Sequence, residues 1–88
     1  MELLFSIIIP AYNEEKSISH CLDSVTQQTL PKEKYEIIVV NNNSRDQTKI
    51  IAQKYPVSVV DEIKQGYTHA LRRGCQKAKG RIFVFTDA

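Results

Sequence analysis

Several features are scarce or missing in this 88-residue sequence, and each excludes a class of protein. It has no tryptophan and only two cysteines, Cys21 and Cys75, which form no CxxC pair. A disulfide framework and a thiolate metal site are therefore not expected, and two reduced thiols suit the cytoplasm. The histidines, His20 and His69, have no metal-ligand spacing either.

Long apolar runs and a strong charge of one sign are also absent. No stretch reaches the ~20 apolar residues that span a bilayer, and no basic segment precedes the short run at residues 3–9, so a signal peptide is not expected. The formal net charge is only +2, with the basic residues dispersed, which disfavours binding to nucleic acid. We expect a cytoplasmic protein. If it works at the cytoplasmic face of a membrane, the attachment lies outside these residues.

What the sequence does contain is an ordinary globular composition, with 42% hydrophobic and 25% charged residues. Four short runs rich in β-branched residues predict strands, and three segments between them predict helices. The predicted strands span residues 3–9, 35–40, 57–60 and 81–85, and the predicted helices span residues 14–27, 46–54 and 66–79.

Local signals refine these helices. Ile18, Cys21, Leu22 and Val25 share one helical face, and Asn13 is placed to cap that first helix. Ser44 or Asp46 would cap the second helix, and Gly80 would end the third. Small residues recur every four positions in the third helix, which predicts close packing on the sheet or, as the alternative, close approach to a ligand; they are Gly66, Ala70, Gly74 and Ala78.

The alternation of strand and helix predicts an α/β fold of the Rossmann-like kind. We expect one domain over residues 1–88, with a parallel sheet in the order 3-2-1-4 and helices on both faces. Ligands of such sheets bind beyond the carboxyl ends of the strands, near the point where the strand order reverses.

Polar residues stand where that rule places a ligand. The first strand is followed by Tyr12 and Glu14, the second ends at Asn41, and the fourth is followed by Asp87. The carboxyl ends of parallel strands meet at one edge of the sheet. We therefore expect Tyr12, Asn41 and Asp87 to lie at that edge.

Four segments together carry a resemblance to a known family. SIIIPAYNEE, IIVVNNNSRDQT, the helix ending in AKG, and RIFVFTDA occur in order over nearly the whole chain. In this combination the sequence resembles glycosyltransferase family 2, enzymes of the GT-A fold that move a sugar from a nucleotide diphosphate to an acceptor. The resemblance implies that the chain is the nucleotide-sugar-binding half of such a domain, which stops where the family's Asp-x-Asp motif begins.

The resemblance also implies a set of donor contacts. Tyr12 and Pro10 would lie beside the nucleotide base, Glu14 beside the base or ribose, and basic side chains near the diphosphate. The substrate-binding residues expected on this basis are Pro10, Ala11, Tyr12, Glu14, Val39, Asn41, Lys64, Arg72, Asp87 and Ala88. Simpler structural roles remain open for several of these: a surface tyrosine in a turn, a helix-dipole glutamate, turn asparagines, and a solvated basic face.

Two positions are of special interest. Asn41 stands where most family members carry an aspartate that accepts a hydrogen bond from the base, and an asparagine keeps the acceptor oxygen but loses the charge. Asp87 matches the first aspartate of the Asp-x-Asp motif, which would hold Mg²⁺ or Mn²⁺ against the diphosphate. The resemblance places the catalytic base beyond residue 88, so we name no catalytic residue here.

The function expected is transfer of a sugar, with inversion, from a nucleotide-diphosphate sugar to a hydroxyl of an acceptor that is a saccharide, a lipid-linked molecule or a protein. Two alternatives stay open: another nucleotide-dependent transferase, and a non-catalytic nucleotide-binding or interaction module. GxGxxG and GxxxxGK[ST] are absent from the sequence, which disfavours a dehydrogenase and a P-loop ATPase.

The last predicted strand has a further consequence. In the order 3-2-1-4 it lies at the edge of the sheet, and the run from Ile82 to Phe85 is apolar throughout. Exposed apolar edges pair readily with other chains. We therefore expect self-association through this edge.

Overall fold

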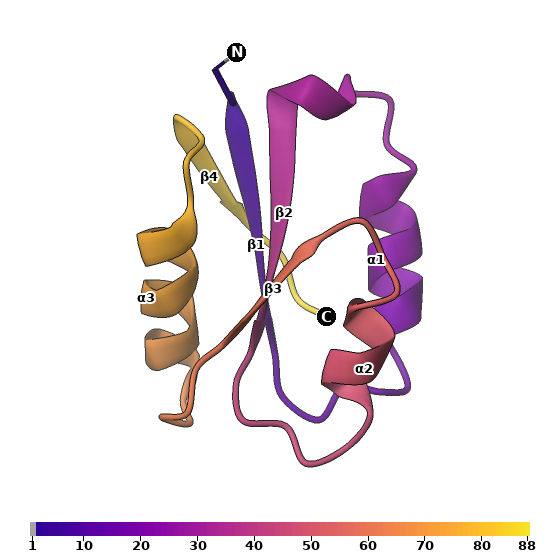
Figure 1. Ribbon diagram of the computed structural model, residues 1–88, viewed down its shortest axis with the longest axis vertical. Helices are drawn as coiled ribbons and strands as arrows, with labels where there is room; N and C mark the ends of the chain where they lie inside the picture. The colour runs from indigo at the N-terminus through magenta and orange to yellow at the C-terminus, as the bar shows by residue number, and fades with distance from the viewer. Residues whose placement is uncertain (1) are drawn as a thin grey trace.

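A computed structural model describes residues 2–88 and shows strands and helices alternating along the chain (Figure 1). The elements are β1 (Phe5–Ala11), α1 (Ile18–Thr26), η1 (Lys32–Lys34), β2 (Tyr35–Asn41), α2 (Thr48–Ala52), β3 (Ser58–Asp61), α3 (Tyr67–Lys77) and β4 (Ile82–Phe85). Within residues 2–88, no helix is long and apolar enough to cross a membrane.

The strands form one parallel sheet in the order β3-β2-β1-β4, which confirms the predicted topology. β1 and β2 are the two central strands and pair along their whole length, from Phe5 opposite Tyr35 to Ala11 opposite Asn41. A strand with neighbours on both sides and helices on both faces is buried everywhere except at its ends. That position explains the continuous apolar runs in these two strands.

Pro10 lies inside β1 rather than ending it, because its missing N–H is not needed there. Backbone groups of successive strand residues point to alternate sides, and Ala11 bonds toward β2 through its carbonyl oxygen. Pro10 therefore faces the β4 side, where strand pairing has already ended at Ile8 opposite Phe85. A proline is tolerated in a strand where no ladder bond is lost.

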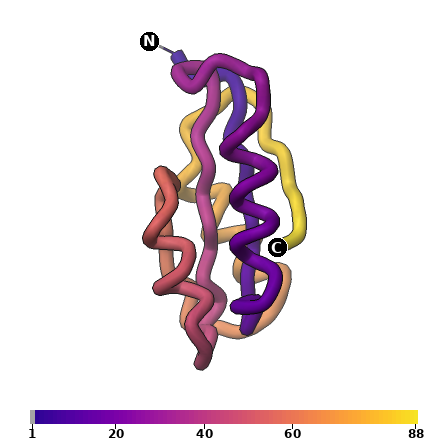
Figure 2. The backbone as a smooth tube through the Cα atoms, turned by 90° about the vertical axis from the view of Figure 1, so that its right-hand side faces the viewer, coloured from indigo at the N-terminus to yellow at the C-terminus, as the bar shows by residue number. Residues whose placement is uncertain are grey.

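Helices cover both faces of the sheet (Figure 1). α1 and α2 lie side by side over one face (Figure 2), and α3 packs against β1 and β2 on the other. The first face forms the larger core, and its fully buried members are Ile9, Ile18, Leu22, Val39 and Ala52. The second core consists of Ile8, Ile38, Val40 and Ala70.

Of the small residues expected to pack on the sheet, Ala70 and Gly74 do so, whereas Gly66 is exposed and precedes α3. Gly74 is buried against the sheet: a Cβ added there would overlap Ile8 Cγ2 and lie 3.2 Å from Val40 Cγ2. Ala70 is also buried in the same core. The helix backbone therefore lies closer to the sheet than a larger side chain at position 74 would allow.

Helix boundaries differ from the predictions, because side chains expected as caps are used across loops. α1 begins at Ile18 with Ser17 as N-cap, so Asn13 does not cap it. Asn13 instead adopts a left-handed conformation (φ 52°), and its Oδ1 accepts the N–H of Arg45 at 2.9 Å.

The other two helices are shorter than predicted. Gln47, and not Ser44 or Asp46, is the residue that directly precedes α2, but Asp46 Oδ1 accepts the Thr48 N–H at 2.9 Å and so holds the first turn as predicted. α3 ends at Lys77, and Ala78 already has extended dihedral angles, so the helix stops before Gly80. When a short polar side chain bonds to a neighbouring loop instead of capping the helix, the helix begins at a later residue.

Candidate functional site

The loops after β1 and β2 lie together at the carboxyl end of the sheet. Backbone N–H groups of the first loop donate to side chains of the second: Asn13 to Ser44 Oγ at 3.0 Å and Glu14 to Thr48 Oγ1 at 2.8 Å. In return, the N–H of Gln47 donates to Glu15 Oε1 at 3.2 Å. These bonds fix the chain where it leaves the two central strands.

Asp46 organises the second of these loops. Its carboxylate accepts the Thr48 hydroxyl, the Thr48 N–H at 2.9 Å and the Glu15 N–H at 3.3 Å. Partial desolvation raises the pKa of Asp46, but these hydrogen bonds favour the charged form and leave the pKa below its ordinary value. The negative charge is therefore retained at neutral pH and holds the start of α2.

Asn42 ties the end of β2 to the loop before α3. Its Nδ2 donates to the carbonyl oxygens of Glu62 and Lys64, at 3.1 and 2.8 Å, and its Oδ1 accepts the N–H of Gly66 at 2.9 Å. Gly66 has φ 137°, a conformation that side-chain-bearing residues rarely adopt. One buried amide thus sets the path of the chain into α3.

Asn41 is turned toward the neighbouring strand. Its Nδ2 donates to Asp61 Oδ1 at 3.1 Å, and its Oδ1 accepts the Ser44 N–H at 3.3 Å. Asp61 also pairs with Lys49 Nζ at 2.8 Å. The hydrogen bond from Lys49, and then that from Asn41, hold the pKa of Asp61 below its usual value.

A pocket of about 340 Å³ opens beside these loops. It lies between the end of β1, the start of α3 and the end of the chain. Tyr12 and Tyr67 are its aromatic members and are unusually exposed, at 45% and 59%. Its lining residues are Pro10, Ala11, Tyr12, Glu14, Asn42, Gln65, Gly66, Tyr67, Ala70, Asp87 and Ala88.

The structure brings six of the ten expected substrate-binding residues to this pocket: Pro10, Ala11, Tyr12, Glu14, Asp87 and Ala88. The convergence of the ends of β1 and β4 is therefore present as predicted. Asn41 lies at the same edge but does not line the pocket. Its amide nitrogen donates to Asp61 and its amide oxygen accepts from the Ser44 N–H, so both ends of the amide are bonded to protein groups.

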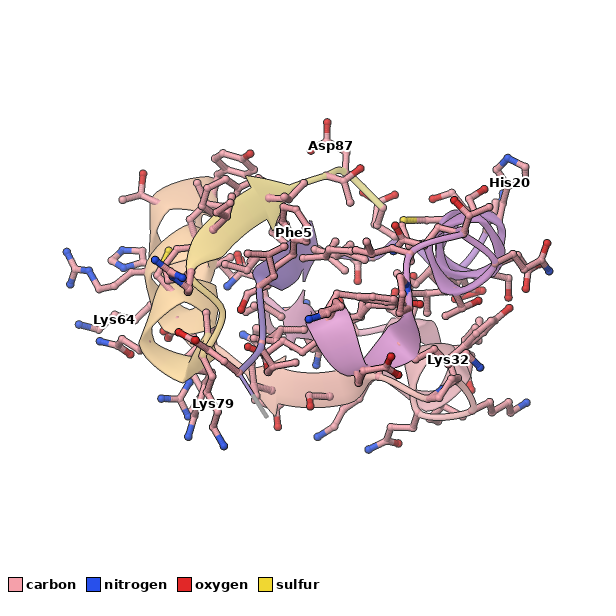
Figure 3. All side chains as sticks on the ribbon, turned by 90° about the horizontal axis from the view of Figure 1, so that it is seen from above. Phe5, His20, Lys32, Lys64, Lys79 and Asp87 are labelled. Atoms are coloured by element: carbon pink, nitrogen blue, oxygen red, sulfur yellow. The ribbon has the colours of Figure 1, made fainter. Side chains whose placement is uncertain are left out.

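Three of the expected residues are placed elsewhere. Val39 is fully buried in the core beneath α1 and α2, so its side chain has no surface to offer a ligand. Lys64 and Arg72 are exposed and outside the pocket. Figure 3 shows Lys64 directed outward on the α3 side of the molecule, away from Asp87.

The expected substrate-binding residues did not include the pocket's other wall, formed by Asn42, Gln65, Gly66, Tyr67 and Ala70. A signal for it was present. Gly66 precedes a helix after a polar loop, and a loop entering a helix at the carboxyl edge of a parallel sheet is a common ligand wall. The left-handed turn position is Asn43 (φ 61°), which leaves the Asn42 side chain free to shape the pocket wall.

Asp87 points outward beyond the end of β4 (Figure 3) and lines the pocket together with Glu14. Its backbone oxygen lies 3.4 Å from Cys21 Sγ. Partial burial, and then the charge of Asp87, raise the pKa of the Cys21 thiol, which favours the neutral form.

The carboxylates at the pocket could supply only a few of the ligands of a bound cation. Among residues 2–88, no three His, Cys, Asp or Glu side chains are grouped closely enough to hold a metal ion. Carboxylate oxygens such as those of Asp87 and Glu14 are ligands that Mg²⁺ and Mn²⁺ accept. Such an ion would complete its coordination with water and substrate phosphate.

Known proteins are similar in sequence to this chain over almost its full length. The family model for Glycosyl transferase family 2 matches residues 6–88. Glycosyltransferase AglE of Haloferax volcanii is 41% identical over 93% of the chain and 29% of its own length. The poly(ribitol-phosphate) beta-glucosyltransferase of Bacillus spizizenii is 42% identical over 94% of the chain and 14% of its own length. The chain thus spans less than a third of these relatives.

Solved structures share the fold closely. S. aureus TarS superimposes with a TM-score of 0.90 and 32% identity, over 97% of this chain and 27% of that one, and it has also been solved with UDP-GlcNAc. The Pyrobaculum calidifontis mannosyltransferase PcManGT, solved with GDP-Man and Mn²⁺, gives a TM-score of 0.86 and 33% identity over 99% of this chain and 28% of that one.

Proposed function

Because the chain belongs to Glycosyl transferase family 2, we propose that residues 6–88 bind the nucleotide of a nucleotide-diphosphate sugar. The whole protein then transfers the sugar to an acceptor hydroxyl with inversion. The observation that carries this proposal is the pocket at the carboxyl edge, where an exposed aromatic ring at the end of β1 faces the same space as a carboxylate after β4.

Tyr12 is the residue we assign to the nucleotide base. Its ring is nearly half exposed and lines the pocket, so a flat base gains contact area there without moving a buried side chain. Any base can stack on an aromatic ring, so other contacts must distinguish one base from another. Pro10 and Ala11, beside it in β1, form an apolar floor.

Asp87, with Glu14 nearby in the same pocket, is the group we assign to the cation. Mg²⁺ or Mn²⁺ would neutralise charge on the departing diphosphate. PcManGT, one of the structural neighbours, holds Mn²⁺ together with its nucleotide sugar, which supports a divalent cation here. In this proposal the bond between the anomeric carbon and the diphosphate would break as the acceptor oxygen attacks from the opposite face, and a carboxylate beyond residue 88 would take the acceptor proton.

The cytoplasm, or the cytoplasmic face of a membrane, is the compartment that we propose. Cys21 and Cys75 are both free thiols, as is usual for a reducing compartment.

The experiment that tests this function is calorimetry with UDP, GDP and TDP, with and without Mn²⁺. We expect heat of binding with at least one nucleotide, and tighter binding with the metal. Nucleoside monophosphates are the matched control, because they share the base but lack the diphosphate. Absence of heat with all three diphosphates, with and without metal, would contradict the proposal.

A further inference from the structure

The backbone on both sides of Gln65 is held by a single buried side chain. Asn42 Nδ2 donates to the carbonyl oxygen of Lys64 at 2.8 Å, and Asn42 Oδ1 accepts the N–H of Gly66 at 2.9 Å. Lys64 and Gly66 are the residues directly before and after Gln65. The point from which the Gln65 side chain extends is therefore fixed by the fold.

The same asparagine connects Gln65 to Tyr12. The backbone N–H of Asn42 donates to the carbonyl oxygen of Ala11 at 2.8 Å, and Ala11 directly precedes Tyr12. Tyr12 and Gln65 are thus each one residue away from a hydrogen-bond partner of Asn42, and both line the pocket of about 340 Å³. A base that stacks on the Tyr12 ring shares this pocket with the Gln65 side chain.

The Gln65 amide keeps most of its hydrogen-bonding capacity free. A glutamine amide has two N–H donors and a carbonyl oxygen that accepts. Within residues 2–88, the Gln65 side chain makes one long hydrogen bond, from Nε2 to the Asn43 carbonyl oxygen at 3.4 Å. That bond uses one N–H, so the second N–H and the oxygen Oε1 remain for a ligand.

The other amide and carboxylate side chains of the pocket are less suited to read a base. Asn42 uses both ends of its amide on backbone groups. Glu14 accepts the Ser17 hydroxyl at 3.0 Å, and an ionised carboxylate has no N–H to donate. Asp87 has the same limitation. Among the described residues that line the pocket, the Gln65 amide is therefore the one that can both donate to a base edge and accept from it.

Asn41, the residue that the family resemblance places at the base, is not available for this role. It does not line the pocket, and its amide is bonded to Asp61 and to the Ser44 N–H. Turning the amide toward the pocket would leave both of these groups without a partner, which costs free energy where they are partly buried. Recognition of the base therefore falls to a different side chain.

Resting on the proposed binding of a nucleotide, we propose that Gln65, rather than Asn41, recognises the base. The free N–H and Oε1 of its amide pair with a carbonyl oxygen and the adjacent ring N–H of uracil, thymine or guanine, each of which presents these two groups side by side. Bases that stack on an aromatic side chain are commonly identified by hydrogen bonds at such an edge. Tyr12 supplies the stacking surface and Gln65 supplies the hydrogen bonds.

Methylated nucleotides test this pairing. The probes are the diphosphates of N3-methyluridine, N3-methylthymidine and N1-methylguanosine, in which a methyl group replaces the ring hydrogen that Oε1 accepts. Calorimetry with Mn²⁺ compares the best-bound nucleotide with its methylated form. The parent protein should bind the methylated form about fivefold or more weakly, the effect of losing one hydrogen bond. Gln65→Ala, which removes the amide and leaves room for the methyl group, should bind both forms alike.

Two further variants separate this role from effects on the fold. Gln76→Ala makes the same change at an exposed site of α3 outside the pocket and should keep the parent's preference for the unmethylated nucleotide. Asn41→Leu should also keep that preference, even if less of the protein is folded. The preference is a ratio of two dissociation constants measured on one sample, so the folded fraction cancels.

The outcomes distinguish this assignment from the proposed function. Equal binding of both forms by the parent, an unchanged preference in Gln65→Ala, or loss of the preference in Asn41→Leu would each overturn the assignment of Gln65. In all three cases a nucleoside diphosphate still binds, so the proposed function stands. If no diphosphate binds to the parent protein, the proposed function fails and the assignment of Gln65 fails with it.

Discussion

Glu14 and Thr48 are joined by a 2.8 Å hydrogen bond from the backbone N–H of Glu14 to the Thr48 hydroxyl, across 34 positions of sequence. Thr48 is fully buried, and its hydroxyl in turn donates to Asp46. One hydroxyl group thus connects the loop that carries Tyr12 to the start of α2.

Thr48→Val should destabilise the fold by about 1–3 kcal/mol, because it keeps the shape of the side chain but leaves the Glu14 N–H without its acceptor. Urea denaturation followed by circular dichroism measures the loss. Thr68→Val, at an exposed position of α3, is the control and should be close to neutral. Equal midpoints for the two variants would show that the loop bond contributes nothing.

Gly74→Ala should destabilise the fold by about 1–3 kcal/mol, although alanine is the better helix former. The added methyl group would overlap Ile8 Cγ2, so α3 or the side chain must move. Gln76→Ala, on the exposed face of the same helix, provides the comparison and should not lower the stability. A gain in thermal stability for Gly74→Ala would mean that the helix has room to shift.

Tyr12→Ala should weaken nucleotide binding by about 1–3 kcal/mol, the range for the loss of one base stack. Tyr12→Phe keeps the ring and should bind nearly as the parent protein does. Calorimetry with the best-bound diphosphate distinguishes the two. If the phenylalanine variant loses as much affinity as the alanine variant, the hydroxyl rather than the stacking surface is what matters.

Asn41→Asp should destabilise the protein at neutral pH, because it replaces the donor to Asp61 by a second carboxylate. The pKa of Asp61 is lower in the folded state than in the unfolded chain, so its ionised carboxylate stabilises the native state at any pH above the unfolded-state pKa. This stabilisation is lost as the pH falls through the folded-state pKa. Like-charge repulsion in the variant raises that pKa. The difference from the parent should therefore be largest near pH 7 and shrink below about pH 4 as the carboxylates protonate.

Stability measured by urea denaturation at both pH values tests this expectation. Asn41→Leu is the companion variant, because it removes the donor without adding a charge, and its deficit should change less with pH. An Asn41→Asp protein as stable as the parent at pH 7 would show that its carboxylates separate freely.

The topology of the sheet was predictable because it depends on coarse features. Buried central strands require apolar runs, and short alternating elements with right-handed crossovers leave only a few ways to wind a parallel sheet. The edge at which Tyr12 and Asp87 meet follows from that topology alone, with no knowledge of side-chain contacts.

Contacts between loops were not predictable in the same way. Asn13 carries the right side chain for a helix cap, yet a partner in a distant loop, the Arg45 N–H, takes its oxygen. Likewise, the alternation of β2 does not reveal that Val39 faces the core and Asn41 faces Asp61 until the register with β1 and β3 is known. Choices of this kind depend on which loops meet in three dimensions.

Asn42 gives the pocket a wall that is shaped by contacts within the chain itself. Its amide holds the carbonyl groups of Glu62 and Lys64 and the N–H of Gly66, so the approach to Tyr67 is fixed without any contribution from a ligand. A ligand that docks against such a preorganised surface need not order a loop. At sites where binding does order a loop, the lost conformational entropy lowers the affinity. Binding at this wall should therefore be fast and accompanied by little backbone movement, with adjustment confined to exposed side chains such as Tyr12 and Tyr67.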